Sequence, residues 1–243
     1  MSHARAAGAG RVLKDPALTL SVLVLWVFIG LFILLPMAVL LVGVFSTDGR
    51  LTGENILQIL SDRNQIAAFR NSLWLAFLVG VFGTLLGFLF AFTACRAGVP
   101  RRLTGLMDAL VLLPLVSPPF TTAIGMIFSF GPRGLLTYHL LGMKGATVYG
   151  LWSTLFSEVL TFFPIAYLAL KPMLNAIDSN IERMALSLGA GRFRVFRTVT
   201  LPLCAPGLAN SFLLLFAASL ADFATPLILA GNAFPVLPTE AYL

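Results

Sequence analysis

Long apolar stretches constrain this sequence more than any other feature. A helix needs about 20 residues to cross the roughly 30 Å hydrocarbon core of a bilayer. Stretches of that length cover about residues 18–45, 73–94, 106–130, 148–170 and 208–229. Hydrophobic residues make up 58% of the chain and charged residues only 11%, whereas a soluble domain carries about 25% charged residues. We therefore predict an all-α integral membrane protein with about five transmembrane helices.

The distribution of Lys and Arg predicts how these helices are oriented. The N-terminal tail and the loops after the second and fourth stretches carry eleven of the 16 basic residues. Because cytoplasmic loops of membrane proteins are enriched in Lys and Arg, we expect a multi-pass protein of the cell inner (cytoplasmic) membrane with its N-terminus in the cytoplasm. The same rule accounts for the net charge of +6, so the basic composition does not require a nucleic-acid partner.

The cytoplasmic loop over residues 175–206 carries the most informative pattern. Four of its apolar residues follow the spacing i, i+3, i+4 and i+7, which places them on one face of a helix. They are Ile181, Met184, Ala185 and Leu188. Asp178 or Ser179 is a suitable N-cap for this helix. The loop between the fourth and fifth stretches therefore contains a short amphipathic helix.

Two glycines, Gly189 and Gly191, interrupt this helix. A second short amphipathic stretch follows them, and we expect Leu201-Pro202 to end it, since proline breaks a helix interior. Beside a bilayer, an apolar stripe of this kind has three uses. It lies in the membrane interface, packs on the protein's own helix ends, or docks in a groove of a cytoplasmic partner. The pattern alone leaves these three open.

This segment resembles the signature loop of permease subunits in binding-protein-dependent ABC importers. The family pattern is Glu-Ala-Ala, three residues, Gly, roughly nine further residues and Ile-x-Leu-Pro, and it is specific only in the right structural context. Here Gly189 supplies the glycine, and Val199 to Pro202 supply the end. The triplet falls on residues 183–185, so the acidic residue is displaced to Glu182 and one alanine is kept.

The resemblance covers about residues 71–243 and is strongest to ferric-iron-type permeases. Further motifs that carry it lie over residues 113–119, 121–125, 221–227, 231–232 and 237–240. Close relatives by the same resemblance import aminoethylphosphonate, polyamines or sulfate-like anions. The family has a further helix after this point, so we expect a chain that is truncated at its C-terminus. Residues 1–70 would form the N-terminal tail, first transmembrane helix and periplasmic loop, and residues 71–243 the incomplete permease core.

The resemblance implies a type I ABC importer permease fold without its last helix, and a transport function that is not enzymatic. Two permease halves, fused or separate, would form the pathway in the bilayer. ABC ATPase subunits would bind on the cytoplasmic side and hydrolyse ATP, so no cofactor is expected on this chain. A periplasmic or lipid-anchored substrate-binding protein would deliver the cargo. The implied ATPase-coupling residues are Ile181, Glu182, Met184, Ala185, Leu188, Gly189, Arg192, Leu201 and Pro202.

Three acidic residues lie in or beside the apolar stretches. We expect Asp108 near a cytoplasmic helix end in contact with solvent, and Glu158 and Asp222 near the middle of their helices. An ionisable group in a bilayer costs about 2.5–3.5 kcal/mol on insertion scales, so it faces the bundle interior or water. Glu158 and Asp222 therefore either fix helix packing or line the translocation pathway or its gate. Pro118 and Pro119 kink the third stretch, and this kink likewise either serves packing or shapes the translocation pathway or its gate.

Other classes of function lack the residues they need. The sequence has no Gly-x-x-x-x-Gly-Lys-Ser/Thr loop for phosphate binding, so the chain is not itself the ATPase. Its histidines (His3 and His139) and cysteines (Cys95 and Cys204) do not follow a metal-binding pattern, and no catalytic set of nucleophile and base is visible. The alternative of another class is a secondary transporter driven by an ion gradient. Such transporters often contain inverted repeats, and this sequence shows none.

Overall fold

The computed structural model describes residues 16–47, 50–51, 54–118, 120–145 and 147–240. The chain divides into two compact units, Met1–Arg63 and Asn64–Leu243. In the described residues both units are helical, apart from one pair of two-residue strands in the first.

The first unit is built around one long apolar helix. α2 (Pro16–Ile29), the π-helical η1 (Gly30–Leu34) and α3 (Leu35–Val44) together span 29 residues without a break. The wider π turn lies directly before Pro36 and accommodates its missing backbone donor. None of the described side chains of this helix is buried, and an apolar surface of this length requires lipid around it. The first predicted span is confirmed. β1 (Ser46–Thr47), which pairs antiparallel with β2 (Arg50–Leu51), and α4 (Glu54–Ser61) follow it.

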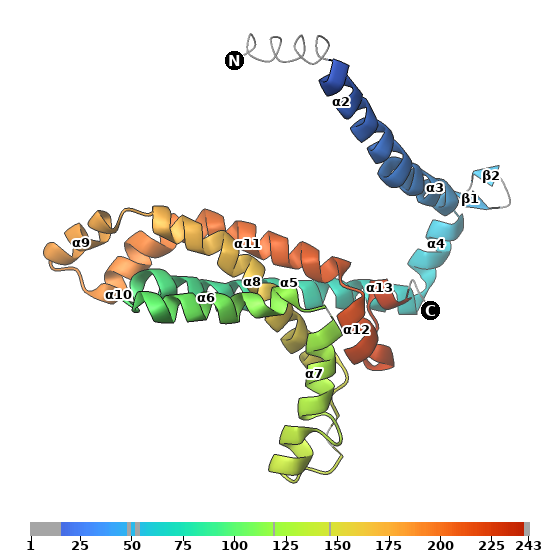
Figure 1. Cartoon of the computed structure of the whole chain (residues 1–243). Helices are drawn as coiled ribbons and strands as arrows, with labels where there is room; N and C mark the ends of the chain where they lie inside the picture. Colours follow the sequence, from blue (N-terminus) through green and yellow to red (C-terminus); the bar gives the residue numbers. More distant parts are fainter. Residues whose placement is uncertain (1–15, 48–49, 52–53, 119, 146, 241–243) are drawn as a thin grey trace. The chain divides into compact units, whose positions relative to one another are not determined.

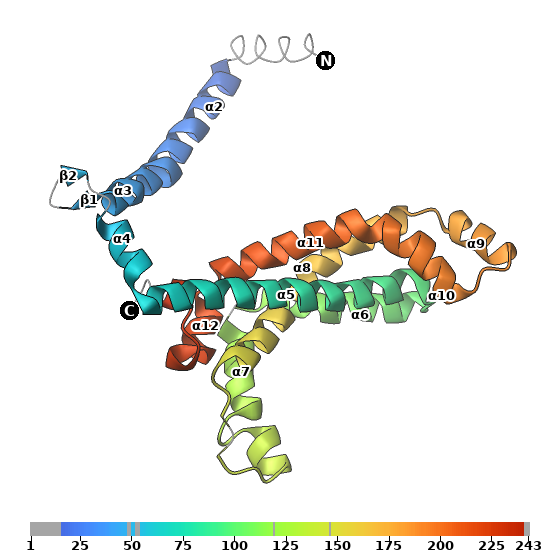
Figure 2. The same ribbon diagram turned by 180° about the vertical axis from the view of Figure 1, so that it is seen from behind.

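Three long helices form the frame of the second unit and lie side by side in Figures 1 and 2. They are α5 (Arg63–Arg96), α8 (Leu151–Ala176) and a continuous helix over Arg192–Ala221 that consists of α10 (Arg192–Val195), η3 (Phe196–Thr200) and α11 (Leu201–Ala221). α6 (Arg101–Val116) packs against α8. Buried apolar side chains of these helices form the core, among them Phe88, Val111, Phe163, Tyr167, Leu170, Leu174 and Leu215.

The third predicted span is bent at its prolines. α6 ends at Val116, and α7 (Phe120–Phe130) with the π-helical η2 (Leu135–Leu140) continues at 101° to it. Pro114 stays inside α6. The bend begins at Ser117, whose backbone is extended, because the residue before a proline is pushed out of the helical region. Four described helices are long and apolar enough to cross a membrane, and the bent pair makes a fifth if it counts as one span.

After α11 the chain folds back against the starts of α8 and α5. Its elements are α12 (Ala224–Leu229), the 3-10 helix η4 (Gly231–Ala233) and α13 (Leu237–Glu240). The amide of Gly150, directly before α8, donates to the carbonyl oxygen of Leu229 at 2.8 Å. The side chain of Asn71 on α5 donates to the carbonyl oxygen of Pro235 at 2.9 Å. These hydrogen bonds attach the last described residues to the frame.

Two expectations about the last long helix are wrong. Leu201-Pro202 does not end a helix, because the π-helical η3 directly before it lets the amide of Leu201 reach back to Phe196, and Pro202 sits in the first turn of α11. The helix ends instead at Ala221, so Asp222 lies at the helix end and not in the middle of the span. The side chain of Asp222 accepts hydrogen bonds from the next backbone amides, which offers the chain an alternative to continuing the helix.

α5 approaches α8 closely at a glycine. A Cβ atom at Gly87 would lie 2.6 Å from the Cβ of Ala166 and 2.9 Å from the backbone nitrogen of Tyr167. Because these are atoms of the α8 backbone and its first side-chain carbon, no flexible group can move aside. Small residues of this kind let membrane helices pack at short distance. Gly87 therefore sets the separation of α5 and α8.

We predict that Gly87→Ala destabilises the purified protein, whereas Gly105→Ala does not. The added methyl group at position 87 forces α5 away from α8, and overpacking of this kind costs about 1–3 kcal/mol. At Gly105, which is exposed on α6, an added Cβ would have no described atom within 4 Å apart from the chain neighbours and the backbone of its own helix. Thermal unfolding of both variants in detergent measures the difference. Equal unfolding midpoints for the two variants would contradict the role given to Gly87.

Candidate functional site

A short helix, α9 (Ser179–Ser187), connects α8 to α10 at one end of the second unit (Figure 1). Its N-cap is Asp178, whose side-chain oxygen accepts a hydrogen bond from the backbone nitrogen of Asn180 at 2.9 Å. Of the two N-cap candidates in the sequence, Asp178 and Ser179, the cap is therefore Asp178. This bond satisfies one of the backbone donors that a helix start leaves without an intrahelical partner.

α9 ends in a Schellman turn at Gly189. The amide of Ala190 donates to the carbonyl oxygen of Ala185 at 3.1 Å, and the amide of Gly189 donates to that of Leu186 at 3.0 Å. Gly189 has a φ of +84°, which costs a residue with a Cβ atom roughly 1–2 kcal/mol. The predicted order of a helix followed by a glycine turn is confirmed, and the physical reason for glycine at this position is its left-handed backbone.

The outward surface of α9 and α10 is apolar and basic. Met184, Leu188 and Phe193 are 66%, 88% and 75% exposed, and Ile181 is also exposed. Three arginines of this segment and one of η3 are exposed as well: Arg183, Arg192 and Arg194, and Arg197. Ala185 alone of the predicted stripe is half-buried. The stripe therefore does not pack on the protein's own described helix ends, which leaves the membrane interface and a partner's groove.

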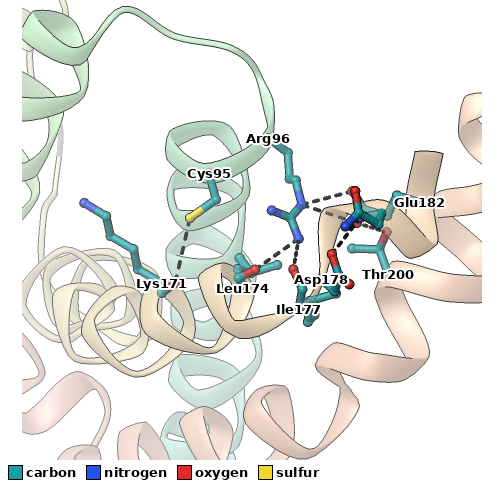
Figure 3. Close-up of polar contacts among 9 residues, drawn as sticks. Cys95, Arg96, Lys171, Leu174, Ile177, Asp178, Glu182 and Thr200 are labelled. Atoms are coloured by element: carbon teal, nitrogen blue, oxygen red, sulfur yellow. Dashed lines mark hydrogen bonds and ion pairs between the residues drawn. The ribbon is translucent and has the colours of Figure 1, made fainter.

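Arg96, the last residue of α5, joins α5 to both α8 and α9 (Figure 3). Its Nη2 atom donates to the carbonyl oxygens of Leu174 and Ile177, at 3.0 and 3.1 Å, where α8 ends. Its Nε atom lies 3.1 Å from Oε2 of Glu182 on α9. The side chains of Arg96 and Glu182 are only 15% and 16% exposed. A cation in this place satisfies the last carbonyls of α8 and interacts favourably with the helix dipole.

Glu182 continues this network to the next membrane helix. Its Oε1 atom accepts a hydrogen bond from the hydroxyl of Thr200 at 2.8 Å. Thr200 is the last residue of η3 and is buried. Arg183, one residue and about 100° further round the helix, is exposed. The acidic residue of the predicted coupling set thus lies on the inner side of α9.

The sequence pattern does not single out Arg96 or Thr200. Arg96 carries one local signal, since it ends an apolar helix where a cation can bind free carbonyl groups. No local signal links it to Glu182, which lies 86 positions later. Three other residues of the predicted coupling set lie outside α9. Arg192 is the first residue of α10, and Leu201 and Pro202 lie within the continuous helix beyond Thr200.

A second polar cluster lies inside the second unit, at Glu158. Glu158 is completely buried, but it lies in the first third of α8 and not near its middle. Its Oε2 atom accepts a hydrogen bond from the hydroxyl of Ser219 on α11. Asp222 is also buried, and its Oδ1 atom accepts hydrogen bonds from the amides of Ala224 and Thr225 at 3.0 and 3.4 Å. Asp222 therefore holds the start of α12. Among the described residues, no group of three or more His, Cys, Asp or Glu side chains is arranged to hold a metal ion.

Glu158 belongs to a polar stripe on the buried face of α8. The stripe follows the helical spacing i, i+3, i+4 and i+7 and consists of Thr154, Ser157, Glu158 and Thr161. The hydroxyls of Thr161 and Thr122 on α7 lie 2.7 Å apart. The stripe thus contacts α7 through Thr161 and α11 through Glu158, which fits the packing alternative. A role of Glu158 and Asp222 in the pathway or gate stays a prediction. A role of Pro118 in the pathway or gate also stays a prediction; this residue is exposed at the bend. Pro119 lies outside the described residues.

Asp108 is in contact with solvent, as expected, but it lies in the middle of α6 and not near its end, and it is also paired. Its Oδ1 atom accepts a hydrogen bond from the hydroxyl of Tyr167 and forms an ion pair with Lys171, both on α8. The carboxylate side chain is 34% exposed. The pairing partners lie on another helix, so the sequence around Asp108 carries no sign of them. The contact ties α6 to α8.

The chain matches known transport proteins over most of its length. The profile of the family described as binding-protein-dependent transport system inner membrane component matches residues 83–243. A putative ferric transport system permease protein of Haemophilus influenzae is 32% identical over 232 residues, which cover 94% of this chain and 36% of the relative. The ferric transport system permease protein FbpB of Actinobacillus pleuropneumoniae is 33% identical, over 87% of this chain and 31% of that protein. This chain therefore spans about a third of the length of these two relatives.

A shorter relative is covered more fully. The molybdenum transport system permease protein ModB of Escherichia coli is 33% identical over 162 residues, or 66% of this chain and 70% of the relative. Among solved structures, a bacterial ABC transporter involved in the import of alginate has a TM-score of 0.80 at 17% identity, covering 96% of this chain and 85% of that chain. The MetNI methionine ABC transporter has a TM-score of 0.52 at 20% identity, covering 66% of this chain and 72% of that chain. The structures show the fold.

We predict that Glu158→Leu destabilises the protein more than Glu158→Gln. Glutamine keeps an oxygen that accepts the hydroxyl of Ser219, whereas leucine leaves this buried hydroxyl without its acceptor at a cost of about 1–3 kcal/mol. The measurement is the thermal unfolding midpoint of each variant in detergent beside the wild type. If the leucine variant is as stable as the glutamine variant, the contact between α8 and α11 contributes nothing to packing.

Proposed function

We infer the function of this chain from the family to which it belongs, the binding-protein-dependent transport system inner membrane components. We propose that it is a transmembrane permease subunit of an ATP-driven importer in the inner membrane. A second permease half completes the translocation pathway, and a periplasmic or lipid-anchored binding protein delivers the cargo. ATP is hydrolysed by separate ATPase subunits, which dock on α9.

The observation that carries the docking proposal is the exposed surface of α9. Met184 and Leu188 present apolar side chains to the outside, and Arg183 and Arg192 lie exposed in the same segment. An amphipathic helix of this kind fits a groove with an apolar floor, and the arginines favour an acidic rim around it. Figures 1 and 2 both place α9 beyond the ends of α5 and α6, which favours a partner over the membrane interface.

The distribution of charge supports a cytoplasmic location for this end of the second unit. The end of α5 and the start of α6 lie at the same end as α9 and α10 (Figures 1 and 2). Basic residues gather there: Arg96, Arg101, Arg102, Arg183, Arg192, Arg194 and Arg197. Because such an excess marks cytoplasmic loops, α9 would face the compartment that holds ATP. By the same rule we propose that the N-terminus lies in the cytoplasm.

For the cargo we propose ferric iron, because two of the similar proteins are named as ferric transport system permeases. A molybdenum permease and sulfate permeases are also similar to this chain, and the sulfate permeases favour a sulfate-like anion as the second candidate. Aminoethylphosphonate and polyamines remain further candidates from the sequence resemblance alone.

We predict that Leu188→Asp lowers the amount of ATPase subunit that co-purifies with the permease by about tenfold or more. An aspartate in an apolar groove loses the contact of the leucine and has to be desolvated, and each 1.4 kcal/mol corresponds to about a factor of ten in affinity. Leu140→Asp on η2 is the matched control, since Leu140 is 72% exposed and lies outside the docking segment. The proposal is wrong if the two aspartate variants retain equal amounts of ATPase.

A further inference from the structure

We propose that Arg96 and Glu182 form a clamp that fixes α9 to the ends of α5, α8 and η3. The two are positioning residues, because they act through the surface of α9. The inference rests on the proposed docking of an ATPase on α9 and names what holds that surface in place.

α9 needs such an attachment because it is short. It has nine residues, and isolated helices shorter than about 12–15 residues are marginal in water. Its apolar side chains Met184 and Leu188 point outward, so they add little to its attachment. Among the described residues, Glu182 makes the polar side-chain contacts that join α9 to other helices. Packing of α9 against α10 and η3 includes the half-buried Ala185, and without Glu182 this limited contact and the two chain connections would hold the helix.

Arg96 suits the clamp because its guanidinium serves several acceptors at once. One side chain reaches the carboxylate of Glu182 and the carbonyl oxygens of Leu174 and Ile177. The planar guanidinium has five N–H donors in a fixed arrangement, while a lysine ammonium is a compact point charge. The cluster is also largely shielded from solvent, which weakens competition from water and salt. Arginine is therefore expected to hold α9 better than lysine.

The far side of the clamp leads into the next membrane helix. Glu182 accepts the hydroxyl of Thr200 at the end of η3. Phe196, at the start of η3, packs against Phe88 and Phe92 of α5, with ring centroids 6.2 and 5.4 Å apart. A displacement of α9 is therefore resisted by α5, α8 and η3 together, and a force applied to α9 reaches all three.

The test compares Arg96→Ala, Arg96→Lys and Glu182→Gln with the control Arg101→Ala in the full chain. Arg101 is exposed at the start of α6, at the same end of the unit. Hydrogen exchange of the α9 amides is measured by mass spectrometry in detergent, and co-purified ATPase is quantified in parallel. We expect exchange in α9 to rise about tenfold in the alanine variant, in line with the loss of helix stability. Exchange in the lysine and glutamine variants should lie between that of the alanine variant and that of the wild type. ATPase retention should fall as exchange rises, and Arg101→Ala should match the wild type in both readouts.

The outcomes separate the clamp from the docking proposal. If α9 exchanges as in the wild type in Arg96→Ala and in Glu182→Gln, the clamp is overturned whether or not ATPase binds. If exchange rises but the wild type retains no ATPase, the clamp stands and the docking proposal fails. If Arg96→Ala also speeds exchange throughout α5 and α8, that variant has disturbed the fold and cannot test the clamp by itself. The test then rests on Glu182→Gln, because glutamine keeps an oxygen that accepts the hydroxyl of Thr200. Unchanged exchange in that variant overturns the clamp.

Discussion

The buried face of α8 is the part of the second unit on which the other helices depend. Helices in a bilayer gain little from apolar contact with each other, so close packing and polar contacts determine their arrangement. α8 provides both. α5 packs against it at Gly87, α6 is tied to it through Asp108 and Lys171, and α11 through Ser219 and Glu158. The carbonyl groups at its C-terminal end, bound by Arg96, then fix where α9 begins.

This arrangement connects the proposed docking surface to the membrane helices through few residues. The outer side of α9 is apolar and basic, as expected for a helix that enters a partner's groove. Its inner side carries Glu182, which contacts Arg96 and Thr200. The same short helix thus separates recognition on one side from attachment on the other. The shift of the acidic residue to position 182 has a physical consequence, because it turns the carboxylate inward and leaves Arg183 exposed.

The sequence predicted the features that depend on local periodicity. The apolar stretches, the helix that became α9 and the glycine turn at Gly189 all follow from spacing along the chain. The continuation of the helix through Pro202 and its end at Ala221 depend on the π-helical η3 and on the side chain of Asp222, which apolar length does not reveal. The partners of Arg96, Asp108 and Glu158 lie on other helices. Their pairing requires the fold, because nothing in the neighbouring sequence specifies it.

The proposed function requires that ATP hydrolysis, coupled through α9, drives import through this chain. The most direct measurement is uptake of radiolabelled ferric iron into proteoliposomes that contain the complete transporter, with its second permease half, ATPase subunits and binding protein. Uptake is compared with ATP supplied to the ATPase side and with an imposed proton or sodium gradient in the absence of ATP. We predict uptake that requires ATP and is unaffected by collapse of the gradient. Uptake driven by the gradient alone would rule out an ATP-driven importer and assign the chain to secondary transport.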